Sequence, residues 1–133
     1  MNLQTRALMM ISAVFMAAAG VGLSFLPQEF LEHIKNPADG FAVAVVEILG
    51  AMYLGFAMLN WAAKGVLIGG IYARPVALGN LMHFAVAATI LVKRLPESAP
   101  PVMLGIAGIY VVLAIWFGLV LFTHPAARNS QGE

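Results

Sequence analysis

The chain has 133 residues, of which 62% are hydrophobic and only 10% are charged, and its formal net charge is +1. Soluble domains carry about 25% charged residues, and a chain this short cannot hide so much apolar surface in a water-soluble core. The low net charge gives no support for a nucleic-acid partner, which needs a concentrated basic face, so we expect none. The chain contains no cysteine, so disulfides, thiolate metal sites and cysteine nucleophiles are excluded as well. We therefore expect an integral membrane protein that forms a single domain over residues 1–133.

Four apolar runs are long enough to cross a hydrocarbon core, which takes about 20 helical residues. The predicted spans are residues 7–26, 41–63, 75–92 and 101–123. The first run continues beyond the length of a signal-peptide apolar region, so we expect it to be retained as a span. The sequence therefore predicts an all-α fold, an integral membrane four-helix bundle.

Two connecting segments have unusual compositions. The segment PQEFLEHIK, at residues 27–35, places Phe30, Leu31 and Ile34 on one side of a helix and most of its charged residues elsewhere. This pattern predicts a short amphipathic helix that lies in the membrane interface between the first two spans. The segment GVLIGGIYA, at residues 65–73, is almost wholly apolar, and its pattern leaves open whether it is a loop or the first turns of the third span.

Small residues recur at a spacing of four on the first two spans, a spacing that lets another helix approach closely. We expect this spacing to mark close packing within the bundle, with a dimerisation motif as the alternative. The pairs are Ala13 with Ala17, Ala18 with Gly22, and Ala51 with Gly55.

An even number of spans places both termini on the same side of the membrane. Only Lys and Arg count in the positive-inside rule, and the side of the termini carries more of them. We therefore expect both termini to be cytoplasmic, in a bacterial inner membrane. The basic residues are Arg6, Lys64, Arg74 and Arg128 on the side of the termini, and Lys35, Lys93 and Arg94 on the other.

Glu47 is the only carboxylate inside a long apolar run. It lies about 9 Å into the hydrocarbon core, at a rise of 1.5 Å per residue. A charged carboxylate at this depth costs at least a few kcal/mol unless it finds a partner. Three states stay open: a protonated carboxyl, an ion pair with Lys93 or Arg94, or hydrogen bonds with Thr89 or Tyr110. Glu47 either couples proton binding to ligand binding or holds helices in register.

Four other polar side chains fall toward the opposite end of the second and third spans. Tyr53 and Asn60 share one helix face, and Asn80 and His83 share another. Antiparallel neighbouring helices would bring these faces to similar depths, which permits one polar cluster. The cluster is either glue between helices, at about 0.6 kcal/mol per hydrogen bond, or a site for a headgroup, a quinone or a small molecule. Glu47 and this cluster form a single site only if Arg74 or the apolar segment at residues 65–73 folds inward to connect them.

No catalytic constellation is visible. The sequence contains no nucleophile–base pair, no phosphate-binding loop and no HExxH motif. His83 has neither a carboxylate nor a second histidine nearby in the sequence, so it is a poor metal ligand. We therefore expect no metal and no catalytic residue, and a membrane enzyme is the least favoured function. No cofactor is predicted, and a quinone is the one candidate.

The second span carries a family resemblance. Glu47-x-x-Gly50, then Leu54-Gly55 and then the polar Asn60 at the end of the helix resemble the second helix of the DoxX-like superfamily of small four-helix membrane proteins. The resemblance implies a compact four-helix bundle. It also implies a membrane protein whose relatives are in some cases linked to quinone-dependent oxidation or act as assembly factors for other membrane proteins.

The run Glu47-Ile48-Leu49-Gly50-Ala51 is also similar to the membrane glutamate motif of small multidrug-resistance exporters. In that family the glutamate binds either protons or cationic drug. The leading hypothesis is a binding or accessory module that holds a lipid-like ligand or partner helices, and the alternative is a proton-coupled small-molecule transporter. We expect membrane lipids as partners, with either a second copy or a larger membrane complex. The candidate site residues are Glu47, Tyr53, Asn60, Arg74, Asn80, His83 and Tyr110.

Overall fold

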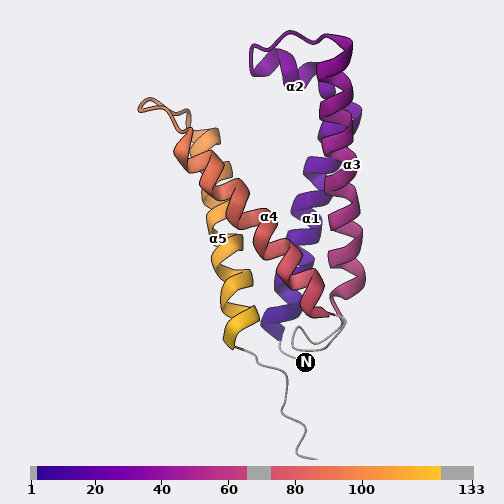
Figure 1. Cartoon of the computed structure of the whole chain (residues 1–133), viewed down its shortest axis with the longest axis vertical. Coiled ribbons are helices and arrows are strands. Elements are labelled where there is room, and N and C mark those ends of the chain that lie inside the picture. Colours follow the sequence, from indigo (N-terminus) through magenta and orange to yellow (C-terminus); the bar gives the residue numbers. More distant parts are fainter. Residues whose placement is uncertain (1–2, 66–72, 124–133) are drawn as a thin grey trace, which may run out of the picture. The chain divides into compact units, whose positions relative to one another are not determined.

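The computed structural model describes residues 3–65 and 73–123, and its ordered elements in these ranges are all helices (Figure 1). Four of them are long and apolar enough to cross a membrane, and a short helix lies between the first and second of these. The predicted all-α membrane fold is confirmed. The helices are α1 (Leu3–Phe25), α2 (Pro27–His33), α3 (Gly40–Ala63), α4 (Ala73–Lys93) and α5 (Pro101–Thr123).

Three helices begin before the predicted spans. Helix α1 begins at Leu3, ahead of the predicted start at residue 7, α3 begins at Gly40, ahead of residue 41, and α4 begins at Ala73, ahead of residue 75. The predicted spans began with the apolar runs, whereas helical hydrogen bonding extends beyond them, in α1 through the polar residues 4–6. Most of the apolar segment at residues 65–73 lies outside the described residues, so its structure stays a prediction.

The short helix α2 has one buried side and one exposed side. Leu31 is 3% exposed, while Phe30 and Ile34 are 40% and 50% exposed. Lys35 follows the helix with a φ of 55°, in the left-handed region that usually belongs to glycine. The amide of Asn36 then donates to the carbonyl of Leu31, which closes the helix as in a Schellman motif. This sharp stop separates α2 from α3.

The chain divides into two compact units. The α1–α3 unit comprises Met9–Lys64 and contains most of α1 together with α2 and α3. The α4–α5 unit comprises residues 1–8 and 65–133 and contains α4 and α5. Figure 1 shows α1 and α3 running side by side in the first unit, and α4 and α5 in the second.

Helices α1 and α3 touch backbone to backbone where Gly20 meets Gly50. A Cβ atom placed on Gly20 would lie 2.8 Å from Leu54 Cγ and 2.9 Å from the carbonyl oxygen of Gly50. A Cβ atom placed on Gly50 would lie 2.7 Å from the amide nitrogen of Ser24 and 2.9 Å from the carbonyl oxygen of Gly20. Only glycine fits at either position, so these two residues set the distance between the helices.

The Gly20–Gly50 contact does not use the pair Ala18 with Gly22 or the pair Ala51 with Gly55. Cβ atoms on Gly22 and Gly55 would meet no atom within 4 Å, and Ala18 and Ala51 are exposed. These four positions therefore do not form the α1–α3 contact, and their packing elsewhere in the bundle stays a prediction. Small residues four positions apart identify each helix face that could accept a neighbouring helix. They do not show which of these faces is turned toward a neighbour in the folded chain.

An aromatic core joins α4 to α5. Phe84 and Phe117 are both 0% exposed, and their rings stack with centroids 5.7 Å apart and an interplanar angle of 14°. Tyr110 packs against Phe84 in an edge-to-face arrangement with a centroid distance of 5.5 Å. Each such pair contributes about 0.5–1.5 kcal/mol beyond the area it buries. The α4–α5 pair is thus held by rings, whereas the α1–α3 pair is held by close backbone contact.

The C-terminal end of α3 carries a cation–π contact. The Lys64 ammonium lies 3.2 Å from the centroid of the Trp61 ring, and Trp61 is 47% exposed. An amphipathic ring and a long cationic side chain at a helix end are typical of the membrane–water interface. This contact therefore indicates where α3 leaves the hydrocarbon region.

Replacing Gly50 with alanine should destabilise the α1–α3 unit by about 1–3 kcal/mol, because the new methyl group overlaps the backbone of α1. Replacing Gly55 with alanine is the matched control. It should be neutral or stabilising by up to about 1 kcal/mol, because alanine favours the helix and its methyl group meets open space. Unfolding in mixed micelles of rising SDS content, followed by circular dichroism, measures both. Equal effects of the two substitutions would contradict the assigned crossing.

Candidate functional site

The seven predicted site residues are divided between the two units. Helix α3 carries Glu47, Tyr53 and Asn60, in the α1–α3 unit. The other four residues belong to the α4–α5 unit. The predicted polar cluster takes two residues from each unit, so its assembly stays a prediction. The residues of the α4–α5 unit are Arg74, Asn80, His83 and Tyr110.

Asn60 links α3 to α1. Its side chain is 0% exposed, and its amide nitrogen donates to Ser12 Oγ at 3.1 Å and approaches Met16 Sδ at 3.7 Å. The Ser12 hydroxyl in turn donates to the carbonyl of Met9 at 3.1 Å. A buried amide is costly in hydrocarbon unless it is hydrogen-bonded, and these contacts satisfy it within the protein. Asn60 therefore has a structural role between helices, and its partners Ser12 and Met16 were not among the predicted residues.

Asn80 is also 0% exposed, and its side-chain nitrogen donates to the carbonyl of Val76, one turn earlier in α4, at 2.8 Å. This bond satisfies part of the amide within its own helix.

Tyr53 is half-buried on the side of α3 that carries Asn60. Arg74 is exposed in the first turn of α4.

The structure brings His83 and Tyr110 together from α4 and α5. Their ring centroids lie 5.9 Å apart with an interplanar angle of 43°. His83 also packs edge-on against Phe84, with a centroid distance of 5.1 Å. Tyr110 is 5% exposed and His83 is half-buried. Sequence spacing could not show this contact, because the two residues lie on different helices.

Glu47 is exposed on α3. The buried residues of the helix include its neighbour Val46, together with Gly50 and Asn60, which contact α1. All four predicted partners of Glu47 belong to the other unit, so each pairing stays a prediction. One of them, Thr89, donates its hydroxyl to the carbonyl of Ala85 at 2.8 Å.

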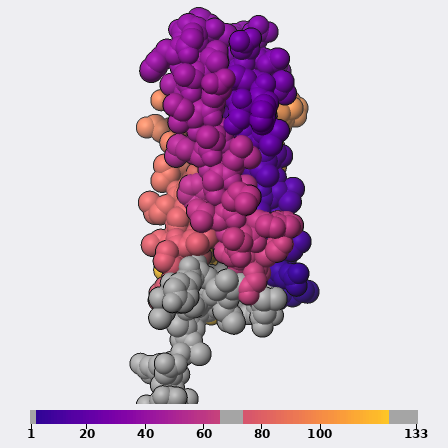
Figure 2. Space-filling view, turned by 90° about the vertical axis from the view of Figure 1, so that its right-hand side faces the viewer, coloured from indigo at the N-terminus to yellow at the C-terminus, as the bar shows by residue number. Residues whose placement is uncertain are grey.

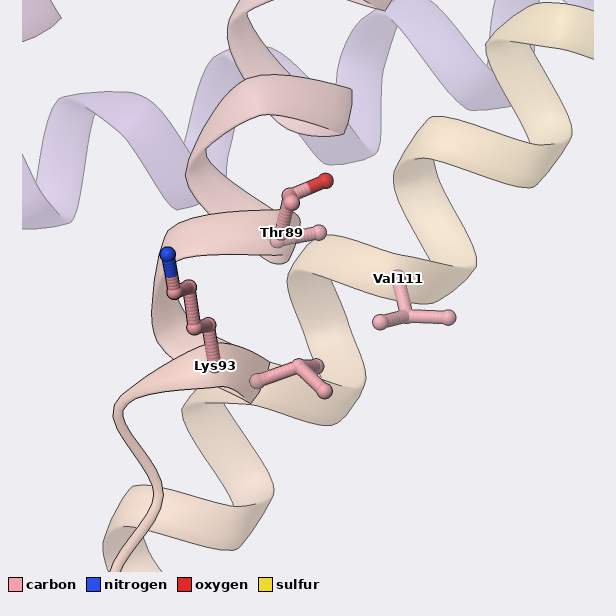
Figure 3. Close-up of a pocket in the computed structure, with 5 residues that line it drawn as sticks. Thr89, Lys93 and Val111 are labelled. Carbon is pink, nitrogen blue, oxygen red and sulfur yellow. The ribbon is translucent and has the colours of Figure 1, made fainter.

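An open groove of about 390 Å³ runs along α4 and α5 near the C-terminal end of α4 (Figure 3). It is an open depression of the surface and not an enclosed cavity. Lys93 is the only charged residue that lines it, and its side chain runs back along α4 toward the turn of Thr89. The lining surface is almost wholly apolar. The lining residues are Ala88, Thr89, Val92, Lys93 and Val111.

Within residues 3–65 and 73–123, no cluster of three or more His, Asp or Glu side chains could hold a metal ion.

The chain matches no protein-family model, and no similar chain was found among curated proteins or solved structures.

The Ser12–Asn60 hydrogen bond should be measurable as a coupling energy. In a double-mutant cycle of Ser12→Ala and Asn60→Ala, the unfolding free energies should show a coupling of about 0.6 kcal/mol, and at most about 1.7 kcal/mol. The control cycle pairs Asn60→Ala with Ser24→Ala, which lies about 18 Å further along α1 at the helical rise. Its coupling should be zero within about 0.3–0.5 kcal/mol. Equal couplings in the two cycles would show that the Ser12–Asn60 hydrogen bond contributes no specific stabilisation to the α1–α3 contact.

Proposed function

We propose that the chain is a membrane-embedded binding module that holds an anionic phospholipid in the groove between α4 and α5. The observation that carries the proposal is the apolar groove with basic side chains at its end. Lys93 lines the groove, and Arg94 follows it directly at the end of the span. Both side chains are exposed, so both ammonium and guanidinium groups are available to a phosphate.

The position of these cations favours a lipid over a partner helix. Lys93 is the last residue of α4, so it lies where the apolar span meets the headgroup region. Small residues favour close approach by a partner helix, and the groove has Ala88 and Thr89, but its other three lining residues are the larger Val92, Val111 and Lys93. An acyl chain can follow such an irregular surface while its phosphate reaches the basic residues. With the predicted cytoplasmic termini, the groove opens toward the opposite leaflet.

Charge, rather than the hydrophobic effect, should decide which lipid binds. Acyl chains are already in hydrocarbon, so entering the groove removes no apolar surface from water. Each Lys or Arg near the membrane surface contributes about 1 kcal/mol toward an anionic headgroup. Two such residues give a preference of about thirtyfold over a zwitterionic lipid at low salt. Glu97, in the following turn, and ionic screening reduce this preference.

Native mass spectrometry of the protein reconstituted with equal amounts of phosphatidylglycerol and phosphatidylcholine tests the proposal. The wild-type chain should retain phosphatidylglycerol with a preference of about ten- to thirtyfold, and the double variant Lys93→Gln, Arg94→Gln should show almost none. The control variant Lys64→Gln, Arg74→Gln removes the same charge from outside the groove and should keep the preference. Equal losses in the two double variants would mean that net charge alone, and not this groove, selects the lipid.

A second pair of variants tests the groove itself. Thr89→Phe places a ring in the groove from an exposed position, so retention of both lipids should fall. Val112→Phe is the control, because Val112 is 58% exposed on α5 and does not line the groove. Unchanged retention in Thr89→Phe would show that the lipid binds elsewhere.

The alternative function, proton-coupled transport of a small molecule through Glu47, stays a prediction, as does membership of the DoxX-like superfamily. What favours the transport alternative is an ionisable carboxyl within a helix long and apolar enough to span the membrane. Substrate-dependent proton release that is lost in Glu47→Gln would support it.

A further inference from the structure

The short helix α2 carries an apolar strip that the α1–α3 unit leaves open. The strip consists of Leu26, Phe30 and Ile34, which follow one another at intervals of one helical turn. The amide of Phe30 donates to the carbonyl of Leu26, and the amide of Ile34 donates to the carbonyl of Phe30, each at 3.1 Å. The three side chains are between 40% and 53% exposed. These three residues are called the α2 strip.

A second apolar side of α2 is used within the protein. Pro27 and Leu31 are buried, and α2 packs against α3. The sequence pattern placed Leu31 on the same side as Phe30 and Ile34, and the structure divides this set: Leu31 faces the protein, while Phe30 and Ile34 do not. The α2 strip is therefore the apolar surface that remains after α2 has packed onto α3.

The rest of α2 is polar, and this side needs water. A charged carboxylate is costly in hydrocarbon, so α2 cannot lie wholly inside the apolar region of a bilayer. Figure 2 shows the purple end of the α1–α3 unit, which includes α2, at the surface of the molecule. The exposed polar residues of α2 are Gln28, Glu29, Glu32 and His33.

The connections of α2 keep it close to hydrocarbon. Helix α1 ends at Phe25 and α3 begins at Gly40, and both helices are long and apolar enough to cross a membrane. Figure 1 shows α2 turned across the end that α1 and α3 share. Phe25 and Phe41, at the adjoining ends of these two spans, are exposed as well. A helix with one apolar and one charged side, joined at both ends to membrane spans, lies at the boundary between hydrocarbon and water.

We propose that the α2 strip is a membrane-surface anchor that inserts between the headgroups and the acyl chains of the leaflet at this end of α1 and α3. Its partner is the lipid surface itself, because lipid reaches this boundary wherever α1 and α3 span a bilayer. A protein partner would first have to displace that lipid. Inserting Leu26, Phe30 and Ile34 removes apolar surface from water, which is the driving force for the anchor.

The α2 anchor does not select anionic lipid, unlike the groove proposed between α4 and α5. Residues 27–35 carry two carboxylates, Glu29 and Glu32, and a single lysine, Lys35. Clusters of basic residues are what draw a helix to anionic headgroups, and this segment has none. Insertion of the strip should therefore depend on its apolar side chains and be insensitive to headgroup charge.

The absence of cysteine permits a test with a nitroxide spin label at a single introduced cysteine in phosphatidylcholine liposomes. A label in lipid collides mainly with oxygen, a label in water collides mainly with a neutral nickel chelate, and a label covered by protein collides little with either. Labels at Phe30→Cys and Ile34→Cys should collide mainly with oxygen, at a depth of about 5–10 Å. Labels at the control positions Glu29→Cys and Glu32→Cys should collide mainly with the nickel chelate, because these positions lie on the polar side.

Two results would overturn the anchor. Dominant collisions with the nickel chelate at Phe30 and Ile34 would place the strip in water. Few collisions with either reagent would show that protein covers the strip, whether from the α4–α5 unit or from another chain. All four positions are exposed within the chain, so the label requires no repacking, and circular dichroism verifies the helical content of each variant.

A second lipid composition tests the insensitivity to headgroup charge. The depth at Phe30 and Ile34 should be the same in liposomes of phosphatidylcholine and in liposomes that contain equal amounts of phosphatidylcholine and phosphatidylglycerol. A strip that enters lipid only when phosphatidylglycerol is present would show that charge, and not the apolar side chains, holds α2, and would overturn the proposal. This measurement is independent of lipid retention in the α4–α5 groove, so either proposal can fail without the other.

Discussion

In the hydrocarbon core of a bilayer, a polar group finds almost no water, so its hydrogen-bond partners must come from protein. The described part of this chain follows that constraint in two ways. Thr89 and Asn80 donate to carbonyl groups one turn earlier in α4, which satisfies them within a single helix. Asn60 instead donates to Ser12 across the α1–α3 contact, so the hydrogen bond that satisfies its amide also links the two helices. Glu47 uses neither solution within Met9–Lys64, and its predicted partners all belong to the α4–α5 unit.

The α1–α3 contact decides which side of α3 is turned toward α1. Gly20 and Gly50 bring the two backbones together, and Val46 and Asn60 are buried on α3 as well. Ala51 and Gly55 lie on the opposite side of α3, away from α1. Both sides carry small residues, so each has the shape for close approach by a helix.

The α4–α5 unit is held together by aromatic rings instead of close backbone contact, and it carries the groove. Stacked and edge-on rings at Phe84, Phe117 and Tyr110 hold the helices at the distance that aromatic side chains require. Beyond the rings, toward the end of α4, Thr89 and Lys93 border an open groove. A bilayer already solvates apolar surface, so this groove can select a ligand only through its shape and its charged end. In the proposed complex, the apolar surface would hold an acyl chain and the basic residues would bind the phosphate of an anionic lipid.

Hydropathy and helix geometry determined the fold class, because a run of about 20 apolar residues in a bilayer can satisfy its backbone only as a helix. They also identified Glu47 and Asn60 as polar groups within apolar helices, which is a property of composition alone. The tertiary structure decided which faces meet. It placed Gly20 against Gly50, where the spacing rule had indicated other pairs, and it assigned Asn60 to Ser12. Spacing along one helix restricts which residues share a face, but only packing selects the face that is turned toward a neighbour.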